Sequence, residues 1–148
     1  MYSKQEATLI RKNFWTVLGR YLAPIPSAGH KKVNWISYKT GVRYIQFHLS
    51  AESTFAKVAI TITHPDGKLR LAYFNLFRQL QDELPGFSLQ QNKADYNGIC
   101  MSVMEKEIIN CNIYRQEDWA IMIAFFKENM ILLDAFWICT MPIFEMLS

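Results

Sequence analysis

Breaks that contain proline and glycine divide this 148-residue chain into segments, and this division constrains the fold most strongly. They lie at Pro24 to Pro26, at Pro65 to Gly67 and at Pro85-Gly86. Proline lacks a backbone donor and disfavours the α region in the residue before it, so helices end at or before the first and third breaks, whereas the second break stops a strand and starts a helix. No internal repeat, linker or low-complexity stretch appears. The sequence therefore predicts a single globular domain over residues 1–148.

Apolar residues at helical spacing predict three helices, over residues 3–22, 67–84 and 119–137. Ser3 and Glu6 form a capping box at the start of the first helix. The acidic pair Glu117-Asp118 precedes the third helix, where the helix dipole favours negative charge. We expect Pro142 to limit any extension of that helix beyond about Trp137.

Alternating and β-branched residues predict an antiparallel sheet of four to six strands. The expected strands cover residues 33–38, 42–49, 55–63, 87–91 and 98–107, with turns at 39–41 and 92–95. Residues 108–114 fit either a further strand or an irregular approach to the last helix. The predicted fold class is α+β, in the order helix, three strands, helix, two strands, helix, with the helices packed on one sheet face.

The apolar stretches near the C-terminus are interrupted by charged or polar residues at 127–129 and by Asp134. A membrane-spanning helix needs roughly 20 mostly apolar residues, so we expect a soluble chain without a membrane partner. The first twelve residues carry four charges and no apolar core, so no secretory signal is expected. These features predict a cytoplasmic protein.

Three cysteines, Cys100, Cys111 and Cys139, form no C-x-x-C motif that would indicate a zinc site or a redox pair. We interpret them as buried, reduced thiols. The sequence predicts no cofactor and no metal site.

Positive charge is concentrated in the first half of the chain. Residues 1–80 carry twelve Lys and Arg against three acids, a net charge of +9, whereas residues 81–148 carry four against ten, a net charge of −6. Such asymmetry marks a surface for an anionic partner. It also suits a homodimer in which the acidic half of one copy neutralises the basic half of another.

Basic residues and rings interleave around the predicted hairpin. The cluster comprises Lys31, Lys32, Trp35, Lys39, Arg43 and Tyr44. Nucleic-acid surfaces combine cations that meet phosphates with aromatic rings on which bases stack. We therefore take Lys31, Lys32, Lys39 and Arg43 as candidate nucleic-acid-binding residues, together with Lys57 if it faces outward. The alternative is that Trp35 lies in the core and that the lysines only solvate the surface.

The predicted order of elements is also that of the PD-(D/E)XK nuclease core. Those enzymes hold a divalent metal with an acid on the second strand and an acid-x-Lys on the third, because phosphodiester hydrolysis needs an activated water. Here the second strand offers Gln46, His48 and Ser50, and Phe55 stands two residues before Lys57. We expect a fold loosely like that core, without its metal ligands.

One candidate pocket lies at His64 and Asp66, where a strand meets a helix. An enzyme at this place requires His64 to meet an acid such as Glu105. In the alternative interpretation Asp66 caps the helix and the imidazole bonds local backbone.

Several short motifs, in their order, carry a family resemblance. They are Phe14-Trp15, Asn34-Trp35-Ile36-x-Tyr38-Lys39-Thr40-Gly41, Thr63-His64-Pro65-Asp66, Asn112-x-Tyr114 with Glu117-Asp118-Trp119, and Phe136-Trp137. On them the chain resembles an uncharacterised bacterial family, domain of unknown function 4268, over almost its whole length. The resemblance implies an intracellular domain and favours nucleic-acid or defence contexts; it supplies no catalytic residues.

The leading hypothesis is a non-catalytic binding module whose basic half meets an anionic partner, nucleic acid first. It requires the basic side chains to converge on one exposed surface. A protein-interaction or homo-oligomeric domain is the second hypothesis, and its sign is an exposed apolar or acidic patch on the later half. The third is an enzyme with a site near His64.

Overall fold

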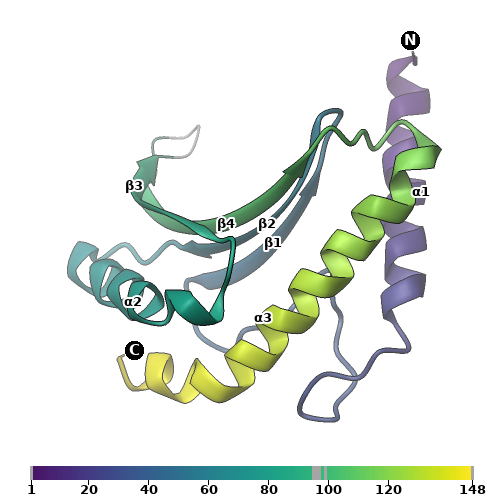
Figure 1. The fold of residues 1–148 in the computed structure, drawn as a ribbon. Helices are drawn as coiled ribbons and strands as arrows, with labels where there is room; N and C mark the ends of the chain where they lie inside the picture. Colours follow the sequence, from purple (N-terminus) through teal and green to yellow (C-terminus); the bar gives the residue numbers. More distant parts are fainter. Residues whose placement is uncertain (1, 95–97, 99, 148) are drawn as a thin grey trace.

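The computed structural model describes residues 2–94, 98 and 100–147, and it shows three long helices and one four-stranded antiparallel sheet (Figure 1). The elements are α1 (Lys4–Leu22), β1 (Ile45–Ala51), β2 (Phe55–Ile62), α2 (Gly67–Gln79), β3 (Ser88–Ala94), β4 (Cys100–Ile109) and α3 (Trp119–Leu147), with short 3-10 turns η1 (Gln81–Glu83) and η2 (Gln116–Asp118). The predicted α+β class and the order of the helices are confirmed.

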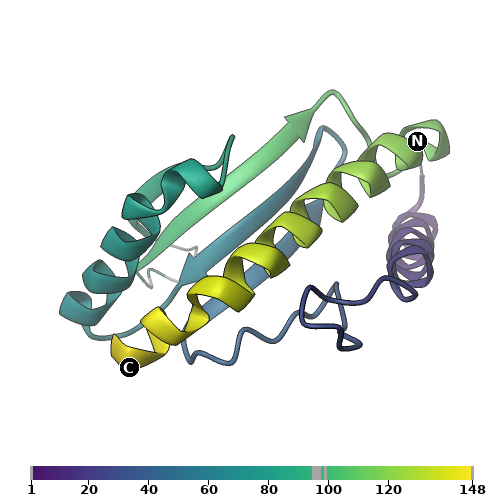
Figure 2. The same ribbon diagram turned by 60° about the horizontal axis from the view of Figure 1, so that its bottom comes forward.

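The sheet has the strand order β1-β2-β4-β3, and every pairing is antiparallel. Phe47, Ile60 and Met104 are cross-strand partners on the face that packs against the helices, and all three are buried. Helices α2 and α3 lie along this face, while α1 lies at the side, next to the N-terminal end of α3 (Figure 2). The opposite face carries the exposed side chains of Gln46 and His48.

The predicted strand over residues 33–38 is wrong, and so is the hairpin turn at 39–41. Residues 23–44, which we call the strap, are irregular, and β1 begins at Ile45 instead of Val42. Several backbone N–H and C=O groups of the strap form hydrogen bonds with side chains, because no strand in the described part of the chain pairs with it. The Asn34 side chain accepts from the N–H groups of Ile36 and Ser37, and the Trp35 indole donates to the Ile25 carbonyl.

A buried carboxylate on α3 holds the strap in place. Asp134, 1% exposed, accepts the Tyr38 hydroxyl at 2.5 Å and the Ala28 backbone N–H at 2.7 Å. Next to it the Trp137 indole donates to the Thr40 carbonyl at 2.6 Å. Hydrogen bonds to a charged acceptor are about twice as strong as neutral ones, so α3 fixes the path of the strap.

Tyr38→Phe is expected to lower the free energy of unfolding by about 2 kcal/mol, because it leaves one buried oxygen of Asp134 without its donor. Burial and the hydrogen bond to Asp134 raise the pKa of Tyr38 above its ordinary 10.0. The unfolded chain therefore releases this proton first, and stability falls as the pH rises above about 10, by up to ~1.4 kcal/mol per pH unit.

Urea unfolding at neutral and alkaline pH measures both effects. The phenylalanine variant should lack the alkaline loss that Tyr38 causes. Tyr21→Phe, at a half-exposed tyrosine of α1, is the matched control and should behave like the wild type. Equal stability of the two variants would contradict the anchoring role of Asp134.

Helix α3 continues past Pro142 to Leu147, so the expected end near Trp137 is wrong. Pro142 removes one helical hydrogen bond. Packing stabilises the turn that follows, since Phe144 is fully buried. The centroid of its ring lies 4.4 Å from that of Phe77 and 5.2 Å from that of Trp137. By length and composition alone α3 would be able to cross a membrane. Eleven of its residues are buried against the rest of the fold, which accounts for much of its apolar character.

The predicted helix starts are confirmed. Ser3 caps α1 by accepting from the Glu6 N–H at 3.1 Å, and Asp66 caps α2 by accepting from the Lys68 N–H at 2.9 Å.

The second hairpin is shifted relative to the prediction. The strand expected at 87–91 continues to Ala94, and Asp95, in the predicted turn, lies outside the described residues. Strand β4 extends to Ile109, and residues 110–115 are irregular. All three cysteines are free, and Cys111 is buried as expected, whereas Cys139 is exposed.

Candidate functional site

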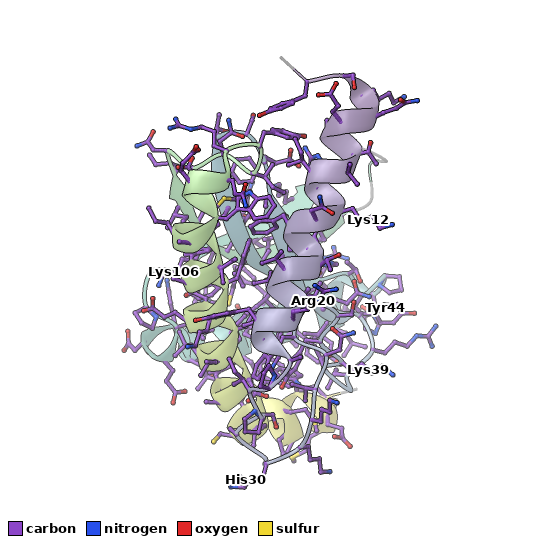
Figure 3. The ribbon with its side chains drawn as sticks, turned by 90° about the vertical axis from the view of Figure 1, so that its right-hand side faces the viewer. Lys12, Arg20, His30, Lys39, Tyr44 and Lys106 are labelled. Atoms are coloured by element: carbon purple, nitrogen blue, oxygen red, sulfur yellow. The ribbon has the colours of Figure 1, made fainter. Side chains whose placement is uncertain are left out.

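Helix α1 and the strap form one side of the molecule. The two segments pack closely. A Cβ atom added at Gly19 of α1 would lie only 3.4 Å from the Cδ1 atom of Ile36 in the strap. Figure 3 shows Lys12 and Arg20 of α1 and Lys39 and Tyr44 of the strap along this side, with His30 at its lower end. We call this surface the α1–strap face and define it by Lys12, Arg20, Lys31, Lys32, Lys39 and Arg43.

The α1–strap face carries cations without matching acids. No Asp or Glu occurs between Glu6 and Glu52 in the sequence. All six basic side chains are exposed. Among the described residues, none of them forms an ion pair or a side-chain hydrogen bond. Their charge is therefore available to an external anion.

Arg11, although it lies in the same helix, is already engaged. Its guanidinium pairs with Glu52 at 2.6 Å and donates to the Tyr114 hydroxyl at 2.6 Å and to the Ala51 carbonyl at 3.3 Å. The hydrogen bond to Glu52 raises the pKa of Arg11. This cluster ties α1 to the β1–β2 turn and to the segment before α3, so Arg11 acts in the fold and not on the face.

A groove of about 910 Å³ runs beside the face, between α1 and the segment that enters α3. Asn13, Thr16 and Arg20 line it from α1, and Arg115 and Trp119 line it from the other side. Its volume lies within the range of small-ligand sites. Arg20 belongs to both surfaces, so the groove continues the α1–strap face.

Aromatic residues contribute differently from what the sequence indicates. Trp35 is only 3% exposed, so it belongs to the core and offers no ring to a base. Tyr44 is half-buried with a positive φ of 70°, and the Arg43 guanidinium lies 4.8 Å from the centre of its ring. The Arg43–Tyr44 pair is the aromatic and cationic combination on this face.

Lys57 does not join the other candidate residues. It lies on the sheet face opposite the helices, where its amine is 3.6 Å from Glu105 and 5.0 Å from the Phe55 ring centre. Glu107 is its cross-strand partner. On the same face, loss of solvation lowers the pKa of His48. Since acids offset Lys57, we exclude it from the candidate interface.

The His64–Glu105 pair that the enzyme hypothesis requires does not form. His64 Nδ1 accepts from the Asp66 backbone N–H at 3.0 Å, and its ring packs on Tyr44 with centroids 4.7 Å apart. Asp66 caps α2, and Glu105 bonds Lys57 instead. His64 and Asp66 therefore connect the end of β2 to the start of α2.

One feature of the nuclease-like interpretation changes. Residues 33–62 form a two-stranded hairpin and not a three-stranded meander. Within the described part of the chain, no group of three or more His, Cys, Asp or Glu side chains is placed to hold a metal ion.

The sequence interpretation missed Lys12 and Arg20, because the basic cluster was assigned to one hairpin alone. It also treated Asp134 only as an interruption of an apolar run. A single acid flanked by apolar residues on a predicted core helix is the signal that identifies such a buried anchor.

Comparison with known proteins gives one match. Residues 10–139 match the family model described as Domain of unknown function (DUF4268). No curated protein and no solved structure matches the chain. Two of the motifs behind the expected resemblance meet in space, since the Trp137 indole bonds the Thr40 carbonyl.

Proposed function

The chain belongs to the family described as a domain of unknown function, DUF4268, and we propose that it is a binding module that holds nucleic acid against the α1–strap face. The observation that carries this proposal is the run of cations on α1 and the strap. This run of residues contains no Asp or Glu between Glu6 and Glu52, and Glu52 itself pairs with Arg11.

The anionic partner is a polymer because the cations extend along the molecule. Lys12 and Arg20 are eight residues apart, which is about 12 Å along a helix at ~1.5 Å per residue. Lys39 continues the row on the strap (Figure 3), and Arg43 follows it beside the Tyr44 ring, 4.8 Å from the ring centre. Successive phosphates of one nucleic-acid strand match such a row, whereas a small anion needs only one or two of these groups.

The groove beside α1 adds a place for bases. Trp119 and Tyr114 line it together with Arg20, so two rings and a guanidinium group lie in one concave surface; Arg115 also lines it but pairs with Glu117 at 3.8 Å. Proteins that bind single strands without sequence preference use this combination of stacking and charge. The proposal therefore favours single-stranded over double-stranded nucleic acid.

Charge reversal on the strap tests the proposal. We expect Lys39→Glu with Arg43→Glu to weaken binding to a labelled single strand of about 20 nucleotides at least ~10-fold, since two phosphate contacts become repulsive. Fluorescence anisotropy at low salt measures the affinity, with a duplex of the same sequence and RNA compared in parallel.

The matched control reverses the same amount of charge elsewhere. Arg78→Glu with Lys106→Glu changes an exposed residue of α2 and a half-buried residue of β4, both outside the α1–strap face. This control should bind nearly as the wild type does. Equal weakening by both pairs would mean that overall charge, and not a defined face, governs binding.

A further inference from the structure

Helix α3 presents an exposed apolar face along its full length. It lies in front of the sheet in Figure 2, with α2 on one side and the strap on the other. Of the twelve large apolar residues that are well exposed in the described chain, six belong to α3: Ile121, Ile131, Ile138, Ile143, Met146 and Leu147. Soluble proteins rarely leave so long an apolar surface without a partner.

The spacing of the exposed residues fits a second helix. Exposed positions alternate in steps of three and four residues: Ile121, Ala124, Glu128, Ile131, Ala135, Ile138 and Pro142. We call this row the α3 seam. An apolar pattern of this period, sustained over about three heptads, is typical of helices that pair in coiled coils. Glu128 is the only charged residue in the seam.

The seam is complementary to itself. Ala124 and Ile138 each lie seven residues from Ile131, so a two-fold axis near Ile131 that pairs antiparallel helices places Ile138 of one copy on Ala124 of the other. The large Ile138 side chain of each copy then packs on the small Ala124 side chain of the other. A two-fold interface requires this self-complementarity.

Charge at the two ends of α3 favours the same antiparallel arrangement. The N-terminal end follows the acidic pair Glu117-Asp118. The basic segments His30 to Lys32 and Lys68 to Arg70 lie near the other end, because Gly29 approaches Ile138 and Tyr73 packs near Phe144 with ring centroids 6.1 Å apart. Antiparallel pairing brings the acidic end of each copy to the basic end of the other, and the helix dipoles also align favourably.

We propose that the α3 seam is the interface of a homodimer in which two copies of this chain pair their α3 helices antiparallel. Of the residues that define the α1–strap face, only Lys31 and Lys32 lie near this interface, so Lys12, Arg20, Lys39 and Arg43 of each copy remain open. It stands independently of the proposed nucleic-acid binding, and reversing the charge of Lys39 and Arg43 should not change the oligomeric state.

Analytical ultracentrifugation over a concentration series tests the dimer. The wild type should show a concentration-dependent dimer, and Ile131→Arg should raise its dissociation constant at least ~100-fold, because two arginines meet at the axis. Ile109→Arg is the matched control, since Ile109 is 66% exposed at the end of β4, away from the seam. Ala124→Arg, at an exposed position, repeats the test if Ile131→Arg fails to fold by circular dichroism.

Disulfide trapping tests the orientation. In a background that carries Cys100→Ser and Cys139→Ser, Ala124→Cys with Ile138→Cys should give on oxidation a covalent dimer in which position 124 of one copy is linked to position 138 of the other. Disulfides require Cα atoms within about 7 Å, so mass spectrometry of the linked peptides reports the register. Links that join position 124 to 124 and position 138 to 138 would show parallel helices and overturn the antiparallel dimer.

Two further results would overturn the proposal. One is a wild type that stays monomeric at every concentration. The other is binding to phosphatidylcholine–phosphatidylglycerol vesicles that Ile131→Arg abolishes and Ile109→Arg retains, which would make a lipid surface the occupant of the seam.

Discussion

Trp137→Ala is expected to lower the free energy of unfolding by about 4 kcal/mol, within the range for removal of a buried aromatic side chain. Trp137 is 3% exposed, and its ring centroid lies 5.6 Å from that of Phe47 and 5.2 Å from that of Phe144. Its indole also donates to the Thr40 carbonyl. Domains of this size are stable by only ~5–15 kcal/mol, so the variant should retain little stability at 37 °C.

Trp137→Phe separates packing from hydrogen bonding. It keeps a ring among the neighbouring aromatics but leaves the Thr40 carbonyl without its donor, so the expected loss is about 1–2 kcal/mol. Urea unfolding followed by circular dichroism measures both variants. A loss below about 1 kcal/mol for Trp137→Ala would contradict the role of this residue in joining α3, the strap and the sheet.

Reversal of four cations should nearly abolish nucleic-acid binding. Adding Lys12→Glu and Arg20→Glu to the two strap substitutions replaces four favourable phosphate contacts by repulsion, and we expect the affinity at low salt to fall by about 10³-fold or more. All four side chains are exposed, so the fold should be retained. Anisotropy titration measures the affinity, and circular dichroism checks the fold.

The α1 pair alone decides whether the helix belongs to the interface. Lys12→Glu with Arg20→Glu should weaken binding about as much as the strap pair does, because Lys12 and Arg20 lie on one side with Lys39 and with Tyr44, which Arg43 contacts (Figure 3). Unchanged affinity in the α1 pair would restrict the interface to the strap. It would also remove the groove that Arg20 lines from the proposed site.

Local signals made most of the helices and strands predictable. The capping residues Ser3 and Asp66 and the β-branched run of β2 act within a few residues of chain, and the structure confirms them. The strap was mistaken for a strand because its alternation imitates one. Its conformation depends instead on contacts with Asp134 and Trp137, which lie about a hundred residues away in the sequence.

The candidate site also depends on contacts between residues that are distant in the sequence. Lys39 and Arg43 were identified from their spacing with rings, but the partners on α1 became visible only when the packing of Gly19 on Ile36 was known. Lys57 was included on the condition that it faces outward, and its acid neighbours could not be foreseen because they follow from sheet register. The extension of α3 past Pro142 depends on the burial of Phe144, which no local pattern reveals.

The salt dependence of nucleic-acid binding by the wild-type protein tests the central claim most directly. With four to six phosphate contacts between a single strand and the α1–strap face, a plot of log affinity against log salt concentration should be linear, with a slope between about −3 and −4. Absence of binding at low salt, or an affinity that salt does not change, would contradict the assignment of this face to nucleic acid.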